Sequence, residues 1–153
     1  MPALPQPPER LTDGTIEIRE MLAWDIPEIL IAFEEDPDLH RRIGRAAPPT
    51  GAQLGRELEQ LLAERVAGRR LTLTIVDPGD PDWRGRVTLK DFDWQARAAS
   101  MQIFLAPQVR GRRYEQRAMS LVLDWLFAAI EVDRVTVTID QAQPRVEFRD
   151  QHG

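Results

Sequence analysis

The stretch Ile103-Phe-Leu-Ala-Pro-Gln-Val-Arg-Gly-Arg-Arg-Tyr114 decides how this chain folds. Its first residues end an apolar run that is typical of a buried strand, and the single glycine among arginines predicts a tight turn. A long amphipathic pattern follows and predicts a helix over Tyr114–Val132. In a strand–turn–helix unit, the first amides of the helix and its positive end point at one place. The sequence therefore predicts a phosphate-binding site at this turn.

The rest of the chain predicts a mixed sheet with helices on both of its faces. Alternation of apolar and polar residues predicts strands over Thr15–Arg19, Leu71–Val76, Gly85–Lys90, Ala98–Leu105 and Arg134–Ile139. Capping patterns predict two helices after the first strand, beginning at Asp25 and Thr50, and Arg145–Arg149 is a candidate edge strand. This order favours an α/β (α+β) fold with a mostly antiparallel sheet and a parallel strand–helix–strand crossover.

Composition excludes several kinds of site. The chain has 153 residues, enough for one domain with its own core. It has no cysteine, which excludes thiol nucleophiles, thiolate metal sites and disulfides. The two histidines, His40 and His152, are too few and too dispersed for a histidine metal site or a triad, and we expect no metal. A net charge of −5 argues against nucleic-acid binding and favours a cationic acceptor.

The beginning of the chain predicts a tail rather than a targeting segment. Residues 1–10 are rich in proline, and we expect a flexible tail before a single domain over residues 11–153. This tail lacks the basic and apolar regions of a signal peptide, and the chain has no run of 18 apolar residues. We therefore expect a cytoplasmic protein without a membrane partner.

Four segments carry a family resemblance. They are Leu11–Arg19, Leu105–Tyr114, Leu123–Phe127 and Asp133–Val137. In these segments the chain resembles the GNAT superfamily of acyl-CoA-dependent N-acetyltransferases, and most of all its ribosomal-protein N-acetyltransferase-like branch. The resemblance implies the GNAT fold, acetyl-CoA as cosubstrate, and transfer of an acetyl group to a primary amine of a small molecule or a protein N-terminus.

The resemblance also implies where coenzyme A binds. The family's turn reads Gln/Arg-x-x-Gly-x-Gly/Ala, and Gln108–Arg113 matches its first and fourth positions. Arg113 departs from the small residue that permits a close approach of diphosphate and a positive φ. Pantetheine would pair with the strand ending at Leu105, whose edge is free because it splays from the strand Val135–Ile139. The implied binding residues are Ile103, Leu105, Gln108, Val109, Arg110, Gly111, Arg112, Arg113 and Tyr114.

Candidate catalytic groups are harder to assign. Direct acetyl transfer needs a base or water for the amine proton and an acid for the leaving thiolate. Many relatives carry a glutamate where this chain aligns Ser100, and serine cannot replace that base. Asp91 and Asp93 lie at the end of the preceding strand and are candidates that would act through water. The sole tyrosine, Tyr114, is a candidate acid, although a packing or phosphate-side role fits its position better.

The C-terminal end departs most from the family. Relatives often read Asp-x-x-Asn-x-x-Ser after the last matched strand, where this chain has Gln143 and Pro144. The 13 residues after Asp140 (153 minus 140) are too few for a further helix and strand pair. We therefore expect a homodimer that covers the sheet through Arg145–Arg149 or Val135–Ile139. The alternative to an enzyme is a non-catalytic GNAT-like module that binds acyl-CoA or mediates oligomerisation.

Overall fold

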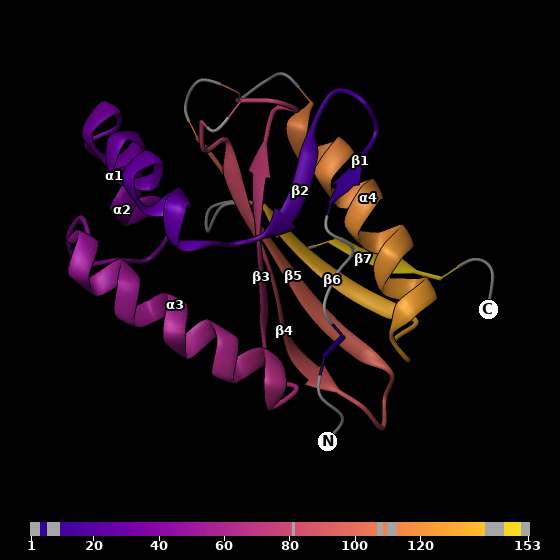
Figure 1. The fold of residues 1–153 in the computed structure, drawn as a ribbon. Helices are drawn as coiled ribbons and strands as arrows, with labels where there is room; N and C mark the ends of the chain where they lie inside the picture. Colours follow the sequence, from indigo (N-terminus) through magenta and orange to yellow (C-terminus); the bar gives the residue numbers. More distant parts are fainter. Residues whose placement is uncertain are drawn as a thin grey trace.

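A seven-stranded sheet organises the molecule, and its strands lie side by side in chain order (Figure 1). The computed structural model describes residues 4–5, 10–80, 82–106, 109, 113–139 and 146–150. The strands are β1 (Leu11–Thr12), β2 (Glu17–Glu20), β3 (Leu71–Val76), β4 (Gly85–Asp93), β5 (Ala98–Leu105), β6 (Arg134–Ile139) and β7 (Val146–Arg149). The helices are η1 (Ala23–Asp25), α1 (Ile26–Glu35), α2 (Leu39–Arg42), α3 (Gly51–Val66) and α4 (Tyr114–Ala129).

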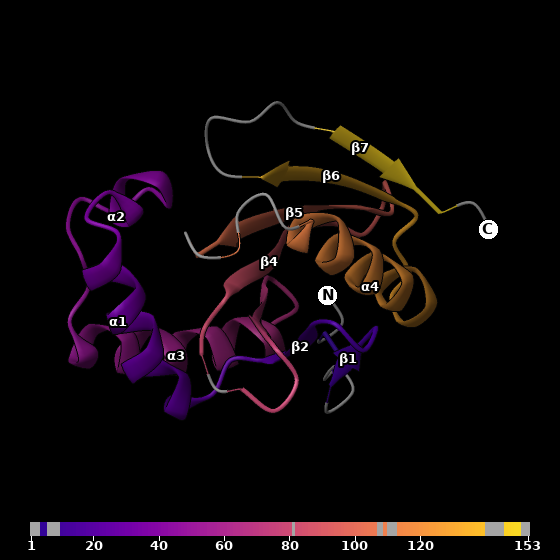
Figure 2. The ribbon, with the colours of Figure 1, turned by 90° about the horizontal axis from the view of Figure 1, so that it is seen from above.

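All neighbouring strands are antiparallel except β5 and β6, which are parallel and joined by α4. Figure 2 shows α4 on one side of the sheet and α1, α2 and α3 on the other. This arrangement confirms the predicted mixed, mostly antiparallel sheet with helices on both faces and a parallel crossover. The candidate edge strand is also confirmed, because β7 pairs with β6 from Val137↔Val146 to Arg134↔Arg149.

The two faces of the sheet differ in polarity because their residues alternate along each strand. On β4 and β5, Val87, Leu89, Met101 and Ile103 are fully buried in the main core cluster, which also includes Val122 and Leu126 of α4. A smaller cluster lies under α1 and α3, where Phe33 of α1 and Leu54 of α3 are buried. The hydrophobic core is therefore concentrated on the α4 side.

Two helix starts were predicted from capping patterns, and they have different outcomes. At Thr50 the capping box is present: Oγ1 accepts a hydrogen bond from the Gln53 N–H at 3.1 Å, and the Thr50 N–H donates to Oε1 of Gln53 at 2.8 Å. At Asp25 the prediction is wrong in detail, because the buried carboxylate accepts the Leu22 N–H and two hydrogen bonds from Arg19 at 2.7 and 2.9 Å. A buried carboxylate needs a cationic partner, and this need decides its role.

Two further predictions need correction: the flexible N-terminal tail and the separation of β5 from β6. Leu4 is only 1% exposed and its N–H donates to the Arg65 carbonyl at 3.0 Å, so the expectation of a loose tail is wrong at this residue. The strands β5 and β6 stay in register up to Ile103↔Ile139, so they do not splay within that span. Phe104 and Leu105 lie beyond the paired part and are in register with Arg86 and Gly85 of β4.

Gly85 brings the two strands β4 and β5 unusually close. A Cβ at this position would lie 2.4 Å from the Phe104 carbonyl oxygen, well inside van der Waals contact. The absence of a side chain therefore fixes how β4 meets the end of β5. Among the described residues, no helix is long and apolar enough to span a membrane.

Candidate functional site

The turn after β5 is only partly described. Gln108, Arg110, Gly111 and Arg112, which the resemblance implies as phosphate ligands, lie outside the described residues. Val109 is buried, and its N–H donates to the Ala106 carbonyl at 3.2 Å. The backbone N–H of Val109 is therefore used inside the turn, whereas its implied role was to hold pyrophosphate.

Arg113 is the residue that sets the direction of α4. It is the N-cap of this helix and has φ 63° and ψ 21°, a left-handed conformation. The family has glycine or alanine here, and glycine adopts this conformation without strain, whereas an arginine costs about 1–2 kcal/mol. The side chain of Arg113 is exposed.

The first turn of α4 fits an anion. Among the described residues, the N-cap residue Arg113 makes no side-chain capping bond, and the first intrahelical bond there runs from the Arg117 N–H to the Arg113 carbonyl. The first turn of a helix directs its amides outward, and the helix dipole adds a partial positive charge. Glu115 in the first turn weakens this field without removing the amide donors. These groups suit the diphosphate of coenzyme A.

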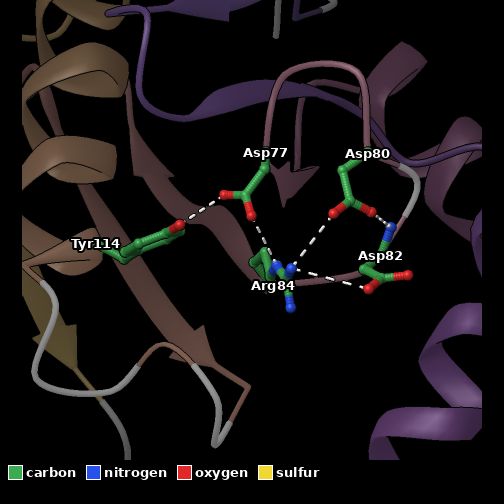
Figure 3. A network of polar contacts seen from close by, with 5 residues as sticks. All are labelled: Asp77, Asp80, Asp82, Arg84 and Tyr114. Carbon is green, nitrogen blue, oxygen red and sulfur yellow. Dashed lines mark hydrogen bonds and ion pairs between the residues drawn. The ribbon is translucent and has the colours of Figure 1, made fainter.

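Tyr114 is held by a polar network that reaches across to the β3–β4 loop (Figure 3). Its hydroxyl donates to Oδ1 of Asp77 at 2.5 Å, and Oδ2 of Asp77 accepts from Nε of Arg84 at 3.1 Å. Arg84 also contacts Asp80 at 3.5 Å and Asp82 at 3.8 Å. The carbonyl of Arg84 accepts the Ala106 N–H at 2.8 Å, so the same residue supports the chain just before the turn.

A cavity of about 340 Å³ opens on the opposite face of the sheet, between α1, α3 and the strands β4 and β5. Phe104 contributes the wall on β5, one residue past the last register pair with β6. Arg86 lines the cavity from β4 and lies 5.6 Å from the centre of the Phe104 ring. The other lining residues are Met21, Ile29, Phe33, Ile43, Arg45, Leu54, Glu57, Gln60, Leu61, Glu64, Arg70 and Trp83.

Arg86 is an uncompensated cation in this wall. Burial, together with the positive charges of Arg45 and Arg70, lowers its pKa to about 10, and the negative charge of Glu57 opposes this shift. The guanidinium remains protonated at neutral pH. Among the described residues it has no ion pair or hydrogen bond, and its Nε is buried without a partner.

The predicted catalytic residues lie outside the lining of this cavity. Ser100 is in register with Lys90 and Thr136 near the other end of β5. Asp91 has φ 52° and lines a shallow neighbouring pocket that shares Glu64 and Arg70 with the cavity. Asp93 is exposed and accepts the Ala96 N–H at 3.0 Å in the β4–β5 hairpin.

Sequence reasoning missed Arg86 and the Arg84 network. The polar positions of Gly85–Lys90 alternate with apolar ones, which normally indicates a face open to water. In the structure α1 and α3 cover that face, so its polar residues line a cavity instead. A signal was present in the length of α3, whose apolar stripe requires a surface to pack on.

Comparison with known proteins identifies the family. A family model described as an acetyltransferase (GNAT) domain matches residues 15–147. The chain therefore belongs to the GNAT acetyltransferase family, as its resemblance implied. No match was found among curated proteins.

Solved structures share the fold at low sequence identity. One is a protein from Vibrio cholerae provisionally assigned as a ribosomal-protein-serine acetyltransferase, with a TM-score of 0.77, 13% identity, and coverage of 91% of this chain and 78% of that one. Another is the ribosomal-protein-S5-alanine acetyltransferase from Vibrio fischeri, with a TM-score of 0.70, 18% identity, and coverage of 84% and 72%. RimL, a ribosomal L7/L12 alpha-N-protein acetyltransferase in complex with coenzyme A, matches with a TM-score of 0.69, 10% identity, and coverage of 84% and 73%.

Proposed function

We propose that this protein transfers the acetyl group of acetyl-CoA to a primary amine. The single observation that carries the proposal is the pairing of two features on opposite faces of one sheet. The uncapped first turn of α4 suits a diphosphate, and the cavity beside Phe104 suits a small acceptor. Phe104 in the cavity wall lies one residue beyond the last register pair of β5 and β6, Ile103↔Ile139. Membership of the GNAT acetyltransferase family supports the same chemistry.

In this proposal the residues around the turn bind acetyl-CoA, and pantetheine follows β5 toward Phe104. Tyr114 positions the turn through Asp77, because its hydroxyl already donates to that carboxylate at 2.5 Å. Bringing the amine and the thioester together in a closed space lowers the entropic part of the barrier. The protein works in the cytoplasm in this proposal, and the acetyl donor is its only cosubstrate.

The amine must lose a proton, and we assign this step to Glu57. This carboxylate lines the cavity, and its ion pair with Arg45 at 2.5 Å fixes its position at the wall. Asp91 and Asp93 would act only through water from outside the lining. Glu57→Gln should lower kcat by about 100-fold, a typical loss for a general base. Asp93→Asn is the matched control and should leave kcat within about twofold, whereas the reverse order of effects would contradict the assignment.

Thermal-shift titration with acetyl-CoA, CoA and ATP tests the binding half of the proposal. Stabilisation should rise with the logarithm of the CoA concentration above its Kd, and ATP should give a smaller effect. Thiol release from acetyl-CoA with a panel of amines then tests turnover. CoA binding without thiol release above the amine-free rate would favour the non-catalytic GNAT-like module.

Gly111→Val tests the location of the pyrophosphate. The family places a glycine at this position of the turn, and a β-branched residue should abolish CoA stabilisation while circular dichroism shows an intact fold. Gly55→Val on α3 changes a glycine far from the turn and should retain CoA binding. Unchanged CoA binding by Gly111→Val would place the pyrophosphate elsewhere.

We also propose a homodimer formed through the outer edge of β7. The strand β6 pairs with β5 and β7, so Val135–Ile139 is covered on both sides and Arg145–Arg149 becomes the better contact. Val146 on β7 is 51% exposed, and soluble proteins normally cover apolar edge strands. Sedimentation at micromolar concentration should give a dimer, and Val146→Lys should shift it to a monomer. A monomeric parent protein would refute the proposal.

A further inference from the structure

The cavity under α1 and α3 has a positive lining, in contrast to the net charge of −5 for the chain. Its charged residues are Arg45, Arg70, Arg86, Glu57 and Glu64. Arg45 is neutralised by Glu57 at 2.5 Å, and Glu64 pairs with Arg69 of the following loop at 2.9 Å. Within the described part of the chain, Arg70 and Arg86 therefore make no ion pair, although Arg70 interacts electrostatically with Glu64, and Arg86 with Glu57.

Arg86 keeps its hydrogen-bond donors available. Its guanidinium carbon lies 5.6 Å from the centre of the Phe104 ring, a cation–π contact that uses no N–H donor. The N–H donors of a guanidinium lie in one plane and match the two oxygens of a carboxylate. The group is therefore free to bind an anion in the cavity.

Two further polar atoms beside Arg86 also lack partners. Nε1 of Trp83 and Oγ1 of Thr74 are buried with no hydrogen bond to a described residue, and Thr74 is the register partner of Arg86 across β3 and β4. Buried polar atoms without partners are rare, because each costs free energy. Two of these atoms, Nε of Arg86 and Nε1 of Trp83, belong to residues that line the cavity, and a bound molecule there would supply the missing acceptors.

We propose that the acceptor substrate is a small amino acid whose carboxylate pairs with Arg86 and whose amine receives the acetyl group. The inference rests on the proposed function and names its substrate class. A cavity of about 340 Å³ is at the small end of ligand sites, which favours a free amino acid over a peptide segment. Phe104 joins the carboxylate site to the end of the β5–β6 pairing, where the acetyl donor is expected. The local charge thus outweighs the cationic preference expected from the net charge.

Thermal-shift and calorimetric titrations of the full chain test this proposal. The probes are glycine, β-alanine, glutamate, methionine and phenylalanine, each compared with its own carboxamide, which keeps the amine and removes the negative charge. At least one amino acid should bind about tenfold or more tightly than its carboxamide, in line with a charged hydrogen-bonded pair. The same amino acid should release thiol from acetyl-CoA faster than its carboxamide does.

Variants of Arg86 localise the effect. Arg86→Met keeps the length of the side chain, removes the charge, and should abolish the preference for the acid over the carboxamide. Arg86→Lys keeps the charge without the planar fork and should retain part of the preference. Arg56→Met on the exposed side of α3 is the control and should behave as the parent chain. If Arg86→Met fails to fold, comparing each amino acid with its carboxamide on the parent chain still shows whether the protein prefers a carboxylate.

The outcomes separate the substrate class from the proposed function. Binding of CoA and turnover of amines with no preference for carboxylates would overturn the amino-acid inference and leave the acetyltransferase proposal standing. Turnover of a peptide N-terminus in preference to every free amino acid would overturn it in the same way. Absence of CoA binding would refute the proposed function itself, and an acid preference that survives Arg86→Met would overturn the assignment to this wall.

Discussion

The two faces of the sheet are built for different purposes. On the α4 side, Met101 and Ile103 are sealed in the main core. On the α1–α3 side, Phe104 and its β4 partner Arg86 line the cavity. The next pair on the same face is Gln102 with Thr88. One strand therefore contributes to stability with alternate residues and to a binding site with the residues between them. Substitutions on the α4 face should therefore lower stability, and substitutions on the α1–α3 face should mainly affect function.

The largest expected difference lies between adjacent residues of β5. Ile103→Ala removes a fully buried side chain from the main core and should lower the free energy of unfolding by about 2–5 kcal/mol. Gln102→Ala on the other face should cost less than about 1 kcal/mol, because among the described residues its side chain makes a single hydrogen bond, from Lys90 at 3.3 Å. Urea denaturation of both variants measures the difference. Similar losses for both would contradict the division between the two faces.

Two nearby arginines, Arg84 just before β4 and Arg86 on β4, sharpen the comparison further. Arg84→Met leaves Asp77, Asp80 and Asp82 without their cation and should cost about 2–3 kcal/mol. Arg86→Met removes an unpaired buried cation and should leave stability unchanged or raise it by on the order of 1 kcal/mol. Denaturation curves of the two variants at pH 7 provide the test, and a greater loss for Arg86→Met would be evidence against an uncompensated charge.

Arg86 should also make the stability of the protein depend on pH. The pKa of Arg86 is lowered to about 10 by burial and by neighbouring positive charge, so the unfolded chain binds the proton more tightly. The buried charge of Arg86 therefore destabilises the folded protein fully below pH 10. This destabilisation declines as the pH rises from about 10 toward the ordinary pKa of arginine. The difference in stability between the parent chain and Arg86→Met should narrow over that interval.

Two glycines provide a smaller contrast. Gly85→Ala places a Cβ 2.4 Å from the Phe104 carbonyl oxygen and should destabilise the protein by about 1–2 kcal/mol while disturbing the cavity wall. Gly55→Ala on α3 has nothing within 4 Å and should stabilise by up to about 1 kcal/mol through helix propensity. Thermal denaturation of the two variants compares them. If Tm changes in the same direction in both variants, β4 and β5 are not in close contact at Gly85.

The smallest expected effect concerns the start of α4. Arg113→Gly relieves a left-handed conformation and should stabilise by about 1 kcal/mol, whereas Arg113→Ala keeps the strain. The glycine variant should also keep CoA binding, since glycine is usual at this position in the family. Denaturation together with CoA titration tests both points, and equal stability of the two variants would contradict the strain.

The sequence predicted the elements whose signals are local and left out those decided by tertiary contacts. The capping box at Thr50 and the start of α4 at Tyr114 follow from neighbours in the chain, and both are confirmed. The role of Asp25 depends on Arg19 of another element, and the burial of Leu4 depends on Arg65 of α3. The cavity depends on which helices cover the second face of the sheet. Arg86 therefore looked like an ordinary polar residue of a half-exposed strand.

A crystal structure of the protein bound to coenzyme A tests the central claim most directly. We predict the diphosphate against the first amides of α4 and the thiol end at Phe104, facing the cavity that contains Arg86. A coenzyme whose thiol end lies on the α4 side and does not reach the cavity would contradict the account. So would a structure in which the exposed side chain of Arg113 folds over the first turn of α4 and displaces the phosphates.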